Sequence, residues 1–156
     1  MTRSIAASPV ATLRAARFAL VLIVAMVACS SNEIEKDGPL RVKDAWARAT
    51  KGTGIGAMYL TLENTDTGAV MILGAATPMA AAAEFHETAE MDGMSHMTKL
   101  DSIPVARGAT LTMKPGGLHV MLIDLKMSIA AGDTVPLVLQ FRDGRRTSAK
   151  AVARAQ

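Results

Sequence analysis

The sequence predicts an all-β fold, a β-sandwich or small Greek-key barrel that forms a single domain. Apolar and polar residues alternate in several short runs, turn residues separate these runs, and 50% of the 156 residues are apolar. Alternation with a period of two is typical of half-buried strands, and this apolar content is enough for a packed core. Only the alanine-rich segment 79–84 favours a helix.

The predicted strands follow one another from about residue 40 onward. Alternation is clearest at 58–63, at 110–113 and at 134–142, and Gly, Asp, Asn and Pro turn signals punctuate the chain between such runs. We expect seven to nine short strands. Proline has no backbone N–H to donate, so Pro136 predicts that its strand lies at a sheet edge.

The N-terminal segment is predicted to be an export signal. Arg14 and Arg17 precede an unbroken apolar run at 18–28, which suits the core of a signal peptide and is too short to span a bilayer. We therefore expect a signal peptide at 1–28, a polar tether at 29–38 and a folded domain at 39–156.

Cys29 is the only cysteine and directly follows the apolar run. Together with Met26, Val27 and Ala28 it resembles a bacterial lipobox, in which the cysteine is lipidated and becomes the new N-terminus. Exported proteins usually pair their cysteines, which favours this interpretation for an unpaired one. The alternative is ordinary cleavage near Ala28, which leaves a free thiol.

The charge and composition exclude several classes of protein. Residues 1–28 hold three of the 17 basic residues and no acidic one, so the remainder carries 14 of each sign and is formally neutral. Aromatic residues make up 3% of the chain, fewer than a base-stacking module needs. We expect no nucleic-acid partner, and contact with a membrane only through a lipid at Cys29.

Two histidines and two methionines are expected to converge. His119 and Met121 are two residues apart in an apolar run, so they project from one face of a strand. A hairpin turn at Asp92-Gly93, or one centred a residue earlier, puts His86 and Met97 on one face as well, because the two registers differ by an even number. If the two segments are neighbours, all four side chains meet.

This set of side chains predicts a copper site, and Cu(I) in particular. Thioether sulfur is a soft ligand and imidazole suits copper, whereas magnesium and calcium prefer oxygen. A blue-copper site needs a cysteine thiolate beside its histidines, and the folded segment has none. We find no nucleophile–base pair or phosphate loop, so the protein is not expected to be an enzyme.

The spacing of these four residues resembles the motif of the PCu(A)C family of periplasmic copper chaperones. Ten residues separate His86 from Met97, twenty-one separate Met97 from His119, and one separates His119 from Met121. Four neighbouring segments resemble that family as well, namely 44–48, 57–64, 115–122 and 132–137. The resemblance covers roughly residues 40–153.

The resemblance implies a cupredoxin-like barrel without the cupredoxin copper ligands. It also implies a periplasmic protein that delivers Cu(I) toward the copper centres of cytochrome c oxidase, often alongside Sco-type thiol proteins. The lipobox-like segment departs from a plain cleaved signal. It leaves open whether this protein diffuses freely or is anchored to the cell envelope.

Two alternatives remain at this point. The chain could be a structural or adhesive envelope lipoprotein without metal, or an enzyme such as a copper oxidase or reductase. Met91, Met94 and His96 have either no role in an exposed loop or an auxiliary role in handling copper. Five further methionines are expected to fill the core, namely Met58, Met71, Met79, Met113 and Met127.

Overall fold

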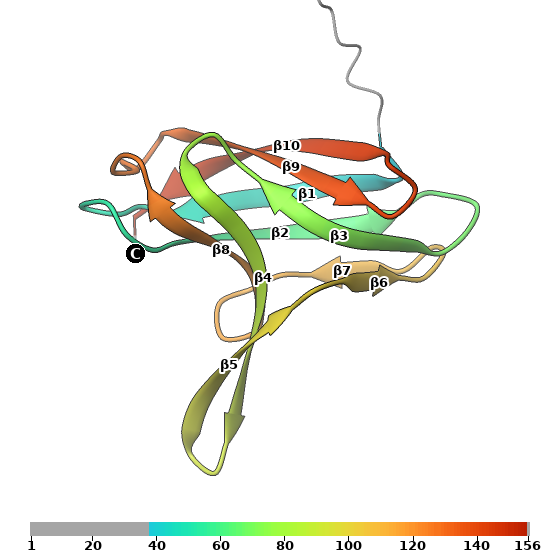
Figure 1. Ribbon diagram of the computed structural model, residues 1–156, viewed down its shortest axis with the longest axis horizontal. Helices are drawn as coiled ribbons and strands as arrows, with labels where there is room; N and C mark the ends of the chain where they lie inside the picture. Colours follow the sequence, from blue (N-terminus) through green and yellow to red (C-terminus); the bar gives the residue numbers. More distant parts are fainter. Residues whose placement is uncertain (1–37, 156) are drawn as a thin grey trace, which may run out of the picture. The chain divides into compact units, whose positions relative to one another are not determined.

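The computed structural model describes residues 38–155, and these form ten β-strands with no helix among them. The all-β prediction is confirmed (Figure 1). The strand count exceeds the expected seven to nine, and two of the strands, β6 and β7, have three residues each. The strands are β1 Leu40–Arg48, β2 Gly56–Asn64, β3 Val70–Ala76, β4 Ala80–Met91, β5 Met94–Leu100, β6 Ile103–Val105, β7 Thr110–Thr112, β8 Leu118–Leu125, β9 Thr134–Phe141 and β10 Arg146–Arg154.

Seven of these strands close into a barrel. Their order is β4-β8-β2-β1-β10-β9-β3, and the pair Ala75↔Ala83 joins β3 back to β4. Neighbouring strands are antiparallel except β1 and β10, which are parallel. The strands β5, β6 and β7 are additions that pair with β4, β3 and β2. The described residues thus form the small barrel that the sequence predicts.

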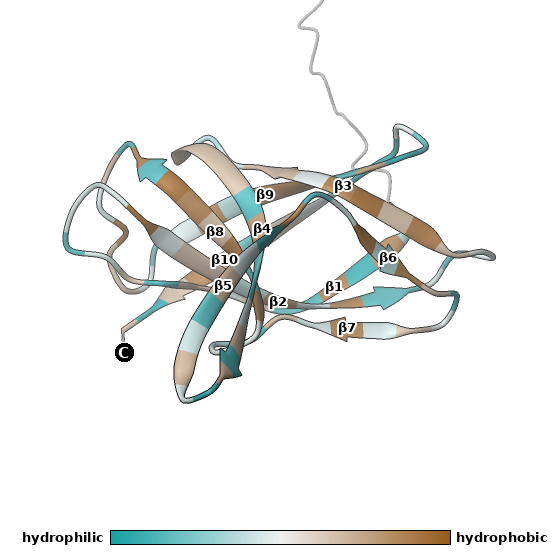
Figure 2. Ribbon diagram, turned by 60° about the horizontal axis from the view of Figure 1, so that its bottom comes forward, coloured by the Kyte–Doolittle hydropathy of each residue, from teal (hydrophilic) through white to brown (hydrophobic). Residues whose placement is uncertain are grey.

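The barrel interior is filled by residues at alternate positions. Along β9, the buried side chains are Val135, Leu137, Leu139 and Phe141. This alternation buries one face of each strand and leaves the other outside. In Figure 2 the barrel strands β3 and β8 are largely hydrophobic, whereas the hairpin of β4 and β5 carries hydrophilic bands.

The prediction that Pro136 marks an edge strand is wrong. Strand β9 lies between β10 and β3. Pro136 pairs with Lys150 of β10, but the pairing of β9 with β3 ends at Val138. Pro136 therefore lies beyond the segment of β9 that pairs with β3. Its missing N–H interrupts no hydrogen bond to β3.

The alanine-rich segment is a strand, and this corrects the helix that its composition favours. Residues 80–83 open β4 and pair with β8, so tertiary pairing overrides the intrinsic propensity of alanine. Met79 packs against the core as expected. Met127 does not, because 56% of it is exposed.

Strand β4 is twelve residues long and continues past the barrel with β5 as a projecting hairpin (Figure 1). The hairpin turns at Asp92-Gly93, whose φ angles of 54° and 73° are those of a type I′ turn. Pairing therefore sets Met91 opposite Met94 and Thr88 opposite Met97. Of the two registers considered above, the structure has the one with the Asp92-Gly93 turn.

The expected signal peptide at 1–28, Cys29 and all but the last residue of the tether at 29–38 lie outside the described residues. Between residues 38 and 155, no helix has the length and apolar character needed to cross a membrane.

Asn64 joins three parts of the barrel from a buried position. Its amide nitrogen donates to the carbonyl oxygens of Gly68, Val105 and Ala106 at 2.9–3.0 Å, and its side-chain oxygen accepts from the backbone N–H of Asp66. Only 2% of Asn64 is exposed. The side-chain amide of Asn64 thus links the end of β2 to the following turn and to the end of β6.

Replacing Asn64 by alanine should lower the free energy of unfolding by about 2–3 kcal/mol, because it leaves one buried and two partly buried carbonyl groups without their donor. Urea unfolding followed by circular dichroism measures this change. The control is Gln140→Ala, which removes an exposed amide and should change stability by less than about 0.5 kcal/mol. Equal effects of the two substitutions would contradict the anchoring role of Asn64.

Candidate metal centre

Two histidines face each other across β4 and β8. His86 pairs directly with His119, and the centres of their imidazole rings lie 6.1 Å apart. Their chain neighbours Phe85 and Val120 project to the other side of the sheet, where both are buried in the core. The two imidazoles therefore lie on the outer face of the barrel wall.

The two methionines of the predicted set lie on the same face. Met121 is two residues after His119 on β8. Met97 pairs with Thr88, which is two residues after His86 on β4. The pairing of β5, β4 and β8 thus brings the four predicted side chains to one face of three adjacent strands.

An open cavity of about 260 Å³ joins three of these four side chains. Only 6% of His119 is exposed, whereas 53% of Met97 is exposed. The cavity is therefore lined by a buried imidazole and by an exposed thioether. His86 is not among the lining residues, and its ring centre lies 6.1 Å from that of His119, which does line the cavity. The cavity is lined by Arg48, Ile55, Gly56, Ala57, Tyr59, Thr88, Met97, Gly116, His119 and Met121.

The imidazole of His119 is held through one nitrogen. Its Nδ1 lies 2.9 Å from the carbonyl oxygen of Gly117. A carbonyl oxygen only accepts hydrogen bonds, so Nδ1 carries the proton in this contact and donates it. The other nitrogen, Nε2, then keeps an unprotonated lone pair, which is the form that binds a metal.

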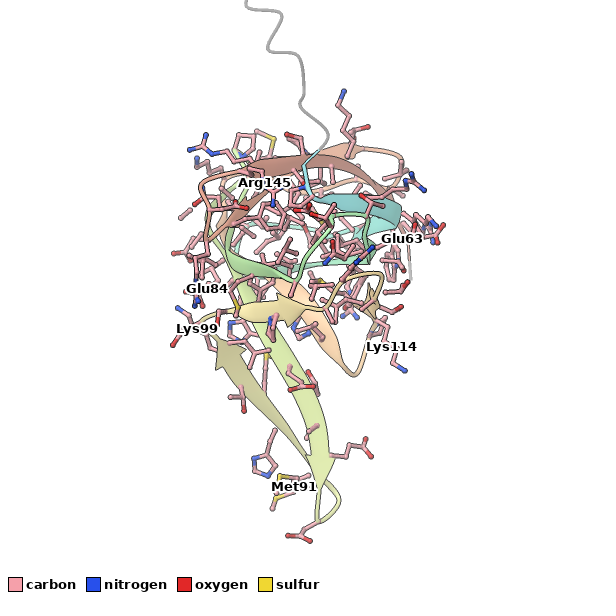
Figure 3. All side chains as sticks on the ribbon, turned by 90° about the vertical axis from the view of Figure 1, so that its right-hand side faces the viewer. Glu63, Glu84, Met91, Lys99, Lys114 and Arg145 are labelled. Carbon is pink, nitrogen blue, oxygen red and sulfur yellow. The ribbon has the colours of Figure 1, made fainter. Side chains whose placement is uncertain are left out.

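The imidazole of His86 is held through Nε2, whereas that of His119 is held through Nδ1. Its Nε2 lies 3.1 Å from a carboxylate oxygen of Glu84, whose second oxygen accepts from Lys99 Nζ at 2.7 Å. The hydrogen bond from Lys99, and next the one from His86, lower the pKa of Glu84, so its carboxylate stays ionised into the acid range. Figure 3 shows Glu84 and Lys99 close together where the hairpin leaves the barrel.

The Nδ1 atom of His86 is buried and has no hydrogen-bond partner within the described part of the chain. A buried polar atom without a partner is uncommon and calls for an explanation. In the neutral imidazole, a proton on Nε2 that is donated to Glu84 leaves a free lone pair on Nδ1. Each of the two imidazoles therefore has one nitrogen fixed by the protein and one available as a ligand.

This arrangement fits a soft metal ion. A metal bound at about 2 Å to one nitrogen of each of two imidazoles sets their ring centres roughly 5–6 Å apart, close to the observed 6.1 Å. No group of three or more His, Cys, Asp or Glu side chains among residues 38–155 is placed to hold a metal. Methionine sulfur, which Met97 and Met121 bring to the same face, is a further donor and a soft one.

Sequence reasoning missed two residues of this site, Tyr59 and Glu84. The ring centre of Tyr59 lies 6.2 Å from that of His119 and 4.4 Å from that of Trp46, so rings form a row across neighbouring strands. The period of two could have placed Glu84 beside His86. The position of Tyr59 depends on which strand pairs with β8, and no local pattern shows that.

The structure separates Met91, Met94 and His96 from the four predicted residues. Met91 and Met94 flank the hairpin turn, and His96 pairs with Ala89. These positions alternate with those of Thr88 and Met97, so the three side chains belong to the opposite face of the hairpin.

The sequence matches a known family over most of its length. A family model described as "LpqE-like: Putative lipoprotein LpqE-like" matches residues 40–153. The chain is 34% identical over 111 residues to "Putative lipoprotein Lxx21020" of Leifsonia xyli subsp. xyli. That match covers 70% of this chain and 66% of the relative, so the chain spans just under two thirds of the relative's length.

Solved structures share the fold. The solution structure of CuI-DR1885 from Deinococcus radiodurans is 31% identical, with a TM-score of 0.60 over 78% of this chain and 83% of that one. The copper-bound PCuAC domain from PmoF2 is 21% identical, with a TM-score of 0.63 over 77% and 96% of the two chains, a likeness of fold alone. The fold that the resemblance to PCu(A)C-type proteins implies is confirmed, and the chain belongs to the LpqE-like family.

Proposed function

We propose that this protein is a copper carrier that binds Cu(I) through two imidazoles and two thioethers and passes the ion to a copper-accepting protein. The observation that carries the proposal is the register of β4 against β8, which sets two imidazoles opposite each other. The methionines share that face and border one cavity with the inner imidazole. The proposed ligands are His86, Met97, His119 and Met121.

The chemistry of these ligands suits a carrier. Imidazole and thioether are neutral, so the four ligands leave the positive charge of Cu(I) uncancelled. Soft sulfur and imidazole favour copper over magnesium or calcium. Met97 is 53% exposed and belongs to β5, which pairs only with β4 among the described strands. It is the ligand that an incoming acceptor can replace first.

The relatives support copper as the cargo. One similar structure is named CuI-DR1885 and another is a copper-bound PCuAC domain. We infer that the acceptor is a copper centre of cytochrome c oxidase, reached directly or through a Sco-type thiol protein. The protein is proposed to act by ligand exchange and not as an enzyme, because no substrate-activating groups accompany the site.

We place the protein in the cell envelope, on the periplasmic side. Residues 1–28 would be removed, Cys29 would carry the lipid, and residues 29–38 would link it to the copper-binding domain at 39–156. A relative and the matching family model are both described as lipoproteins, which supports this assignment.

Replacing His119 or Met121 by alanine should weaken Cu(I) binding at this site by at least about 10-fold, because each change removes a donor. The measurement is anaerobic competition with a coloured Cu(I) chelator on the full-length protein. Met127→Ala removes an exposed thioether after the far end of β8 and should leave the affinity unchanged. Wild-type affinity in both folded ligand variants would leave an envelope lipoprotein without metal as the better explanation.

Glu84→Gln should lower the Cu(I) affinity by about 10-fold, because the carboxylate orients His86 and holds the proton on its Nε2. Glu63→Gln is the matched control, since Glu63 is also ion-paired with a lysine but lies on the other side of the barrel (Figure 3). The same chelator competition compares the two variants. If Glu84→Gln binds as tightly as Glu63→Gln, then His86 does not bind the ion through Nδ1.

Cys29→Ser should release the protein from the membrane fraction, because serine cannot form the lipidated N-terminus. Cell fractionation followed by intact mass spectrometry measures both the location and the added acyl mass. A wild-type protein with an unmodified Cys29, or one that begins after Cys29, would refute the lipid anchor.

A further inference from the structure

A second group of soft side chains lies at the tip of the β4–β5 hairpin. Met91 and Met94 are direct partners across the turn, and His96 lies two residues after Met94 on the same face. We propose that these three side chains form a second Cu(I) site, separate from the centre described above.

The turn geometry determines which side chains meet at the tip. Both central residues of the turn have positive φ angles, as a two-residue type I′ turn requires, and this leaves Met91 opposite Met94. Direct cross-strand partners have Cβ atoms about 5 Å apart. His96 is the diagonal neighbour of Met91, at about 7–8 Å, which long side chains can span.

The three side chains are free to close around an ion. Met91 and Met94 are each 61% exposed, and His96 is exposed as well. Methionine is unbranched and has three rotatable bonds, so its sulfur can be repositioned without moving the backbone. The short side chain of Ala89, the direct partner of His96, leaves space beside the imidazole. One imidazole and two thioethers supply three neutral, soft donors.

The charge of the hairpin also favours a cation. From residue 87 to residue 98 the chain contains Glu87, Glu90 and Asp92 and no lysine or arginine. The nearest basic side chain along β5 is Lys99, which is paired with Glu84 where the hairpin leaves the barrel. The tip therefore has a negative potential that attracts a positive ion.

The tip site is too far from the other centre to share its ion. Met94 and Met97 are three residues apart on β5, which is about 10 Å along a strand, and they face opposite sides. Figure 3 shows Met91 at the outer end of the hairpin, away from the barrel. A use of this site to take up copper rests on the proposed function, but binding at the tip can be tested independently.

The test is a Cu(I) titration of the full-length protein, labelled with ¹³C at the methionine methyl groups, under anaerobic reducing conditions. We expect two bound equivalents, with the methyl signals of Met91 and Met94 shifting and that of Met127 unmoved. The double variant Met91→Leu/Met94→Leu keeps apolar side chains of similar size and should bind one equivalent. Met127→Leu, the matched control, should still bind two.

The outcomes separate the two sites. A single equivalent that leaves the signals of Met91 and Met94 unmoved, and that persists in the double leucine variant, would overturn the tip site and leave the proposed function in place. A single equivalent that survives His119→Ala but is lost in the double leucine variant would support the tip site and overturn the proposed ligand set.

Discussion

The register of β4 against β8 is the constraint on which the candidate centre depends. Phe85 and Val120 are direct partners and are buried inside the barrel. Because successive residues alternate between faces, their packing sends His86 and His119 to the outside as direct partners too. A slip by one residue would exchange an imidazole for an apolar side chain. The hydrophobic core on one face of the wall thus determines the polar arrangement on the other.

The length of β4 gives the molecule two parts, a closed barrel and a hairpin that projects from it. The first half of β4 closes the barrel against β3 and β8, and the second half leaves the barrel with β5 as its partner. His119 is almost fully buried in the first part, whereas Met97 is half exposed in the second. A site built across this division combines fixed imidazoles with a thioether on a less constrained strand, which suits an ion that must be released.

Hydrogen bonds fix the two imidazoles differently. His119 is held by a backbone carbonyl, whereas His86 is held by the carboxylate of Glu84, which Lys99 keeps ionised. At the other side of the cavity, Arg48 donates to the hydroxyl of Tyr59 at 3.3 Å. Arg48 and Lys99 are therefore engaged with neighbouring residues, whereas Met97, His119 and Met121 border the cavity.

The sequence by itself determined the all-β class and the shared face of each histidine–methionine pair, because alternation is a local property. It left two registers open for the hairpin, and the structure has the one with the Asp92-Gly93 turn. It could not determine that β4 pairs with β8, or that β9 is an interior strand despite Pro136. Those features depend on contacts between segments far apart in the chain. Residues 79–84 show the same limit: alanine favours a helix, and barrel closure makes the segment a strand. Only the tertiary structure brought Tyr59 to the site and set Met91 opposite Met94 across the turn.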